Sequence, residues 1–179
     1  MRFADLESRD VAVWGLGREG RAALAALRRR FPDKPLTVYC NPEEARGVRA
    51  VETPFPRDPS LGGEGSTAAL SQEPAFVRTE PPDAGALASH GVVIKSPGIS
   101  AYKPEIIEAQ ARGTVFTSGT ALWFGENPDA RVVAVTGTKG KSTTTAMIAH
   151  CVRSLGIRTA LAGNIGLPLL ELLDAPSPP

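Results

Sequence analysis

A glycine-rich segment at residues 137–143 has the residue types that bind nucleotide phosphates. Glycines let backbone N–H groups converge at the start of a helix, where unpaired donors and the helix dipole both favour an anion. In such loops a lysine reaches the β- and γ-phosphates, and a serine or threonine hydroxyl holds Mg²⁺. The sequence therefore predicts a site for ATP or GTP with Mg²⁺. The residues assigned to it are Gly137, Thr138, Lys139, Gly140, Lys141, Ser142 and Thr143, with Ser142 and Thr143 nearest the metal.

The elements around this segment favour phosphate binding. Residues 132–135 form an apolar run rich in β-branched residues, typical of a buried parallel strand, and Met147, Cys151 and Leu155 then follow at helical spacing. The segment departs from the full Walker pattern, because Val135 stands where that pattern has its first glycine. The alternative is an ordinary strand-to-helix turn with a solvated lysine, and the strand–turn–helix context favours a phosphate site over it.

A second glycine-rich loop, at residues 15–20, follows an apolar strand at residues 11–14 and opens an Ala/Leu-rich helix. Its spacing matches the dinucleotide fingerprint Gly-x-Gly-x-x-Gly. A nicotinamide cofactor also requires an acidic residue where the second strand ends, about 20 residues further on. The second predicted strand, residues 36–39, ends instead in Cys40 and Asn41. From this pattern alone, a nucleotide site and a plain tight turn in an α/β domain remain equally open.

A third loop, Ser96-Pro97-Gly98, ends another short apolar strand at residues 91–95. Ligands of open α/β sheets gather at the carboxyl ends of strands. The Ser96 hydroxyl and the Gly98 N–H are suitable donors for a phosphate or a sugar hydroxyl. Taken alone, the segment is better explained as a Pro-Gly turn leading to a helix that begins near Pro104.

These loops occur together with a fourth segment, Gly163-Asn164-Ile165-Gly166. In their order and rough spacing, the segments at 15–17, 96–99, 137–143 and 163–166 resemble those of the Mur ligase family. The shortened phosphate loop is typical of the Mur and folylpolyglutamate ligases, so its mismatch to the Walker pattern supports the resemblance. The Ser-Pro-Gly-Ile and Gly-Asn-Ile-Gly segments are most similar to those of the D-glutamate-adding member.

The resemblance implies that the N-terminal domain binds the UDP part of UDP-N-acetylmuramoyl-L-alanine. The first loop would line the uridine site, and the third and fourth loops would approach the diphosphate. Family members usually have an Asp at the end of the second strand, and here the amide of Asn41 would replace it. The residues implied for this substrate are Leu16, Gly17, Arg18, Asn41, Ser96, Pro97, Gly98, Gly163 and Asn164.

The reaction that the resemblance implies is ATP-dependent amide formation in peptidoglycan precursor synthesis. A substrate carboxylate attacks the γ-phosphate, and the amine of D-glutamate then opens the acyl phosphate. Lys141 would be the catalytic residue that neutralises charge during transfer. The family also uses a Glu, a His, a carbamylated Lys and a third domain that lie beyond Gly166 in family order. We therefore expect this 179-residue chain to be a truncated ligase, inactive alone.

The pattern of elements predicts an α/β fold. Residues 1–128 are expected to form a Rossmann-like domain with a parallel sheet, and residues 129–179 to begin a P-loop ATPase-type central domain. A lone β–α–β unit cannot cover both faces of its sheet, so the second part should be poorly stable alone or dock on the first. Residues 53–85 are expected to be mostly loop. Further strands are predicted at 75–77, 115–116 and 158–161, helices at 104–112 and 121–124, and a last turn at 169–172.

Composition argues against several classes of protein. Lys and Arg number 20 against 19 Asp and Glu, so no polyanion-binding surface is implied. The chain has no apolar run approaching the roughly 18 residues of a membrane span, and its first residues do not form a signal peptide. We expect a cytoplasmic monomer that binds neither nucleic acid nor membranes. A metal role is not expected for the isolated His90 and His150.

Two alternatives to this ligase stay open. One is a non-catalytic Rossmann module that binds NAD(P) or UDP, although the absence of an acid after Tyr39 argues against NAD(P). The other is a Mur-type ligase for a different amino acid, because amino-acid specificity belongs to a domain that these motifs do not cover.

Overall fold

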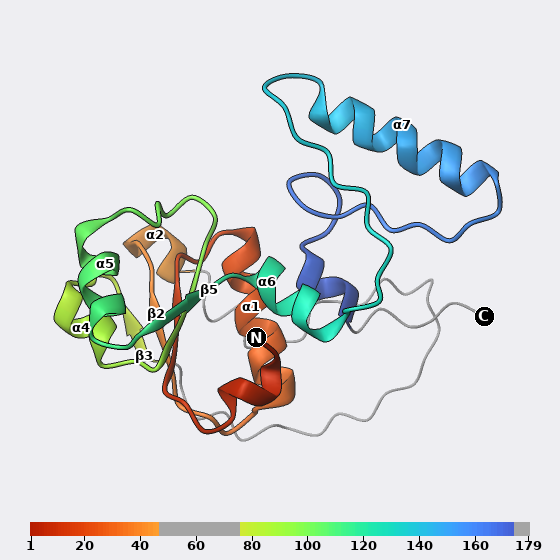
Figure 1. The fold of residues 1–179 in the computed structure, drawn as a ribbon. Helices are drawn as coiled ribbons and strands as arrows, with labels where there is room; N and C mark the ends of the chain where they lie inside the picture. The colour runs from red at the N-terminus through yellow and green to blue at the C-terminus, as the bar shows by residue number, and fades with distance from the viewer. Residues whose placement is uncertain (47–75, 174–179) are drawn as a thin grey trace.

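The computed structural model describes residues 1–46 and 76–173 of the chain (Figure 1). Its centre is a parallel sheet of five strands in the order β3-β2-β1-β4-β5, as the fold prediction required. The order turns around at the central strand, where the chain crosses from β2 and β3 to β4 and β5, and such switch points form ligand-binding crevices. The strands are β1 (Val11–Trp14), β2 (Leu36–Tyr39), β3 (Phe76–Arg78), β4 (Val92–Lys95) and β5 (Val115–Thr117).

The register brings the carboxyl ends of the central strands together. Trp14, the last residue of β1, lies opposite Tyr39 of β2 and Lys95 of β4. All four residues of β1 are buried, as expected for a strand with neighbours on both edges and helices on both faces. The loops that follow these strands therefore meet at one edge of the sheet.

The two faces of the sheet have separate apolar cores. Val11 and Val13 of β1 face one core, and Ala12 and Trp14 face the other, because alternate side chains of a strand point to opposite faces. Helices α1 and α6 pack on the first face, and α4 and α5 pack on the second (Figure 1). The helices are α1 (Arg18–Arg30), α4 (Ala84–Ala88), α5 (Pro104–Ala111) and α6 (Gly119–Glu126).

Four shorter or peripheral elements complete the described chain. A 3-10 turn, η1 (Phe3–Leu6), precedes β1, and α2 (Pro42–Ala45) follows β2. Helix α7 (Lys141–Ser154) follows the phosphate loop as predicted, and the last turn is η2 (Leu169–Leu173). None of the helices in the described ranges is long and apolar enough to cross a membrane.

The predicted strands at 132–135 and 158–161 are wrong, because neither segment pairs with another in the structure. A buried parallel strand needs hydrogen-bonded neighbours and cover on both faces, and the described chain offers neither to these segments. Val133 is 66% exposed, and Met147 of α7 is 63% exposed. Figure 1 accordingly shows α7 apart from the sheet.

Two other expectations for this region have a mixed outcome. Residues 129–179 were expected to be poorly stable alone or to dock on residues 1–128. Docking is seen for η2, whose Leu170 is fully buried in the first core, and not for α7. The segment expected to be mostly loop contains β3 and the start of α4. Its residues 53–75 lie outside the described residues.

Candidate functional site

A cavity of about 640 Å³ lies where the loops after β1, β2, β3 and β4 meet. Its walls include Gly17 and Arg18 from the first loop and Asn41 after β2. Residues 96–98 form another wall, and Asn164 closes the cavity from a segment more than 60 residues further along the chain. All four segments predicted to bind the UDP substrate therefore contribute residues to the walls of this cavity.

The first loop owes its shape to close backbone packing. Gly15 has φ +85°, a left-handed conformation that favours glycine, and its N–H donates to the Tyr39 carbonyl at 2.7 Å. A Cβ at Gly20 would lie only 1.9 Å from the Gly15 carbonyl oxygen, whereas one at Gly17 would meet nothing within 4 Å. Gly15 and Gly20 thus let α1 approach the turn, and Gly17 faces open space. Gly17 is also the N-cap of α1 and provides no side-chain cap, so the first-turn N–H groups retain their capacity to bind an anion.

The third loop is tied to the first by Ser96. Its hydroxyl donates to the Gly15 carbonyl at 2.9 Å, and its N–H donates to the Trp14 carbonyl at 2.8 Å. Lys95 Nζ donates to the Ile99 carbonyl at 2.8 Å, which fixes the turn between them. Residues 96–98 are therefore held at a constant position beside the cavity.

The end of β2 presents a buried thiol and a capping amide. Asn41 is the N-cap of α2, and its Oδ1 accepts from the Glu44 N–H at 2.7 Å. No partner among the described residues accepts from its side-chain amide nitrogen, which can therefore donate to a ligand in the cavity. Burial, followed by the nearby Glu44 carboxylate, raises the pKa of Cys40, so this cysteine remains a thiol at neutral pH.

The cavity wall carries charges of both signs. Arg18 and Lys103 lie beside it together with Glu19, Glu44 and Glu80. Burial raises the pKa of Glu19, and the Arg18 guanidinium partly offsets that effect. Glu44 accepts from the backbone N–H of Asn41 at 3.2 Å, and Arg18 and Glu19 are the charged residues of the first loop itself.

The fourth segment folds back onto the first loop. The Gly163 N–H donates to the Leu167 carbonyl at 2.9 Å, closing a turn, and Arg18 donates to the carbonyls of Asn164, at 3.4 Å, and Gly166. Asn164 reaches the cavity, but Gly163 does not line it. Leu16 was also predicted to contact the substrate. Its side chain is fully buried in the first core and does not line the cavity.

The predicted ATP site, residues 137–143, lies outside this cavity. Gly137 and Gly140 have φ of +144° and +74°, and α7 begins directly after Gly140 without a side-chain cap. Lys141 Nζ donates to the carbonyls of Gly137 and, at 3.2 Å, Thr138. The loop thus has the left-handed glycines and uncapped helix start of a phosphate site, but it does not follow a strand of the sheet that the structure describes.

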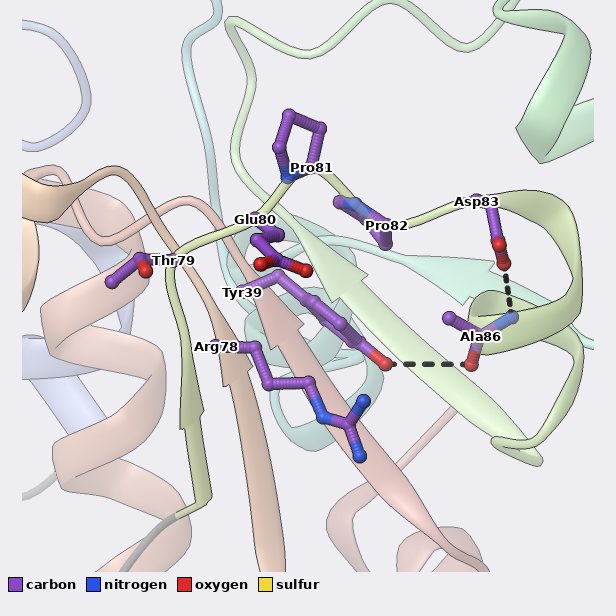
Figure 2. Close-up of a pocket in the computed structure, with 8 residues that line it drawn as sticks. All are labelled: Tyr39, Arg78, Thr79, Glu80, Pro81, Pro82, Asp83 and Ala86. Atoms are coloured by element: carbon purple, nitrogen blue, oxygen red, sulfur yellow. Dashed lines mark hydrogen bonds between the residues drawn. The ribbon is translucent and has the colours of Figure 1, made fainter.

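A second cavity, of about 360 Å³, lies against the first and shares Tyr39 and residues 79–82 with it (Figure 2). The Tyr39 hydroxyl donates to the Ala86 carbonyl at 3.4 Å and lies 3.1 Å from His90 Nε2. Burial raises the pKa of Tyr39 and lowers that of His90. Asp83 caps α4 by accepting from the Ala86 N–H at 2.7 Å, which holds this end of the wall (Figure 2).

Sequence reasoning missed Tyr39, Lys103 and residues 79–82 as lining residues. Tyr39 ends β2 and residues 79–82 directly follow β3, so the rule that ligands bind at the carboxyl ends of strands could have found them. The short predicted strand at 75–77 was in the correct place for that argument. Lys103 precedes α5, and no local pattern marks it as part of the site.

No family model matches the chain. It is 52% identical over 184 residues to a UDP-N-acetylmuramoyl-L-alanine–L-glutamate ligase of Xanthomonas euvesicatoria pv. vesicatoria, covering 100% of this chain and 35% of that protein. Proteins of the same name from Xylella fastidiosa and a Micromonospora species are 48% and 38% identical, covering 97% and 98% of this chain and 34% of each relative. The chain belongs to the Mur ligase family.

This Mur ligase chain spans about a third of the length of the curated relatives it matches. The amino acid in the relatives' names is L-glutamate, whereas the motifs suggested the D-glutamate-adding member. Among solved structures, a UDP-N-acetylmuramate-alanine ligase from Thermotoga maritima is 21% identical with a TM-score of 0.36, covering 83% of this chain and 30% of its own. The assignment to the family rests on the sequence relatives alone.

Proposed function

We propose that this Mur ligase chain binds UDP-N-acetylmuramoyl-L-alanine in the cavity at the carboxyl ends of β1, β2 and β4. The observation that carries the proposal is the convergence of four predicted segments, including Asn164, on one space of about 640 Å³. Such a volume is within the range of small-molecule sites. The names of the relatives support the choice of this nucleotide sugar.

The chemistry of the walls suits a nucleoside diphosphate. The uncapped start of α1 at Gly17 and the Arg18 guanidinium would attract the diphosphate, and the Gly98 N–H and the Asn164 amide would donate to its oxygens. The amide nitrogen of Asn41 would donate to a carbonyl of the uracil ring. Ser96 contributes mainly by holding the loops, since its hydroxyl already donates to Gly15.

For the whole protein we propose ATP-dependent amide formation between this substrate and L-glutamate. The relatives' names favour L-glutamate over the D-glutamate that the motifs suggested. The substrate carboxylate would attack the γ-phosphorus of ATP with release of ADP, and the amine would then displace phosphate from the acyl phosphate. Lys141 would be the catalytic residue that binds the transferred phosphoryl group, once its Nζ leaves the carbonyls of Gly137 and Thr138.

The loop at 137–143 fits a nucleotide phosphate in its local geometry. Its two left-handed glycines and the uncapped N-terminus of α7 are the features that such a group needs. The described residues hold no cluster of His, Cys, Asp or Glu that could bind a metal by itself. Mg²⁺ would therefore be held by Ser142 or Thr143 together with the phosphates, and it would supply neutralising charge there.

Calorimetric titration of the chain tests the proposed substrate site, with UDP and NAD as comparators. We expect saturable binding of UDP-N-acetylmuramoyl-L-alanine, weaker binding of UDP, and none of NAD, because Cys40 and Asn41 stand where NAD needs an acid. Gly17→Asp should abolish binding by placing a carboxylate in the diphosphate position; a Cβ at Gly17 would meet nothing within 4 Å.

Gly17→Ala is the matched control, because it adds a side chain at the same position without the charge. It should retain most of the affinity. Binding of NAD with no binding of the UDP compounds would contradict the proposal, as would equal loss of affinity in the two variants.

A further inference from the structure

The segment that carries Asn164 into the cavity is attached to the first domain at two points. Arg18 donates to the carbonyls of Asn164 and Gly166. A few residues later, the side chain of Leu170 is fully buried between α1 and α6. The segment is thus anchored at one end by an exposed polar contact and at the other by an apolar one.

The side chain of Leu170 is closely packed against the start of α6. A Cβ at Gly119, the first residue of α6, would lie 3.0 Å from Leu170 Cδ1, so the absence of a side chain there makes room for the leucine. Leu169 and Leu173 pack on the same core and are only partly buried. Leu170 is therefore the residue of η2 that inserts, and its two neighbours cover the edge.

The turn between the two anchors is short and constrained. Gly166 has φ +75°, and a Cβ there would lie 2.0 Å from the Leu161 carbonyl oxygen. The Leu167 N–H donates to the same carbonyl at 3.3 Å, and Pro168 follows with its restricted φ. Because only Leu167, Pro168 and Leu169 separate Gly166 from Leu170, fixing Leu170 limits where residues 163–166 can lie.

We propose that Leu170 is a positioning residue for the substrate site: its insertion between α1 and α6 holds Asn164 at the cavity. The inference rests on the proposed function, since it concerns the same nucleotide-sugar site. It assigns to a buried leucine, which touches no ligand, part of the affinity for the diphosphate.

A double-mutant cycle with Asn164→Ala tests the proposal in the full chain. We expect Leu170→Ala and Asn164→Ala each to weaken binding of UDP-N-acetylmuramoyl-L-alanine about tenfold, the value of one good hydrogen bond. The double variant should bind no more weakly than either single one, because both changes remove the same contact. Leu170→Met should restore most of the affinity, and Leu169→Ala is the control on the same turn.

Affinity of Leu170→Ala equal to that of the unchanged chain would overturn the proposal, and so would losses that multiply in the double variant. Amide hydrogen exchange without ligand separates this outcome from failure of the proposed function. The Gly163 and Leu167 N–H groups should exchange faster in Leu170→Ala than in Leu169→Ala. Unchanged exchange would overturn the proposal even if the chain bound no UDP compound.

Discussion

The two glycine-rich loops of this chain, residues 15–20 and 137–143, are built alike and placed differently. Each contains a glycine with positive φ and opens a helix whose N-cap is a glycine. The first loop follows the central strand of a sheet and borders a cavity. The second follows residues 130–136, which pair with no strand in the described part of the chain, and α7 after it has a single buried residue, Ala149.

The comparison separates what neighbouring residues determine from what distant ones determine. The curl of each loop and the start of each helix arise from residues within a few positions of one another. A binding cavity needs in addition walls from other loops, and the first loop obtains these from Asn41, Ser96 and Asn164. The second loop has the local geometry of a phosphate site without such walls.

The largest expected effect comes from the close packing of the first loop, and it is tested by comparing the stability of Gly20→Ala with that of Gly17→Ala. At Gly20 the new methyl group would lie 1.9 Å from a backbone oxygen, and at Gly17 it would meet nothing within 4 Å. We expect Gly20→Ala to lower the free energy of unfolding by about 3 kcal/mol, and Gly17→Ala to change it by less than about 1 kcal/mol. Trp14 and Trp123, the two tryptophans of the chain, both report on the first domain, so denaturant unfolding can be followed by fluorescence. Equal stability of the two variants would show that the tight packing at Gly20 is not present.

Gly140→Ala probes the second loop in the same way. With φ +74° and open space around it, the new side chain causes backbone strain of about 1 kcal/mol and no clash. We expect the fluorescence transition to stay where it is, and amide exchange in the first turn of α7 to become faster. A fall of about 1 kcal/mol in the stability that the tryptophans report would mean that the two regions unfold as one unit.

Ser96→Ala removes the hydrogen bond that joins the first and third loops. Loss of the 2.9 Å contact with the Gly15 carbonyl should lower the free energy of unfolding by about 1 kcal/mol. Ser100→Ala is the control, because its hydroxyl accepts from the N–H of Tyr102 in an exposed turn. If the two variants lost the same stability, the link between the loops would not be a specific support of the cavity.

The smallest expected effect is a pH dependence at His90, whose Nε2 lies 3.1 Å from the hydroxyl of the wall residue Tyr39. Burial lowers the pKa of His90 below its usual 6.5, with a further lowering by Arg78 and an opposing effect of Asp10. The unfolded chain then binds more protons than the folded one as the pH falls through 6.5, so stability is complete above that pH and decreases below it. We expect His90→Gln to flatten this decrease in urea unfolding between pH 7.5 and about 5; a decrease of the same slope in the variant would assign it to other groups.

The sheet and most of the site could be predicted because their signals are local. Strands β1, β2 and β4 are short, mostly apolar runs, each followed by a turn, and the loops after them contain Gly17, Asn41 and Ser96. The strand predicted at 132–135 has the same kind of signal. It failed because forming a strand also depends on a partner, which no local pattern contains.

The wall formed by Asn164 also depends on residues that are distant in the sequence. Asn164 was found only through resemblance to a family, since nothing around it predicts contact with a loop near residue 18. Lys103 was missed because its position in the wall follows from tertiary packing. Leu170 was predicted to be in a last turn, and its insertion between α1 and α6 is visible only in the folded chain.

The most direct test of the central claim is to titrate the ¹⁵N-labelled chain with UDP and follow the backbone amides by NMR. The cavity predicts saturable shifts of residues 15–18, Ser96, Gly98 and Asn164, and unchanged signals from residues 137–143. Shifts confined to residues 137–143 would contradict it, because UDP would then bind at the phosphate loop and not at the carboxyl ends of the strands.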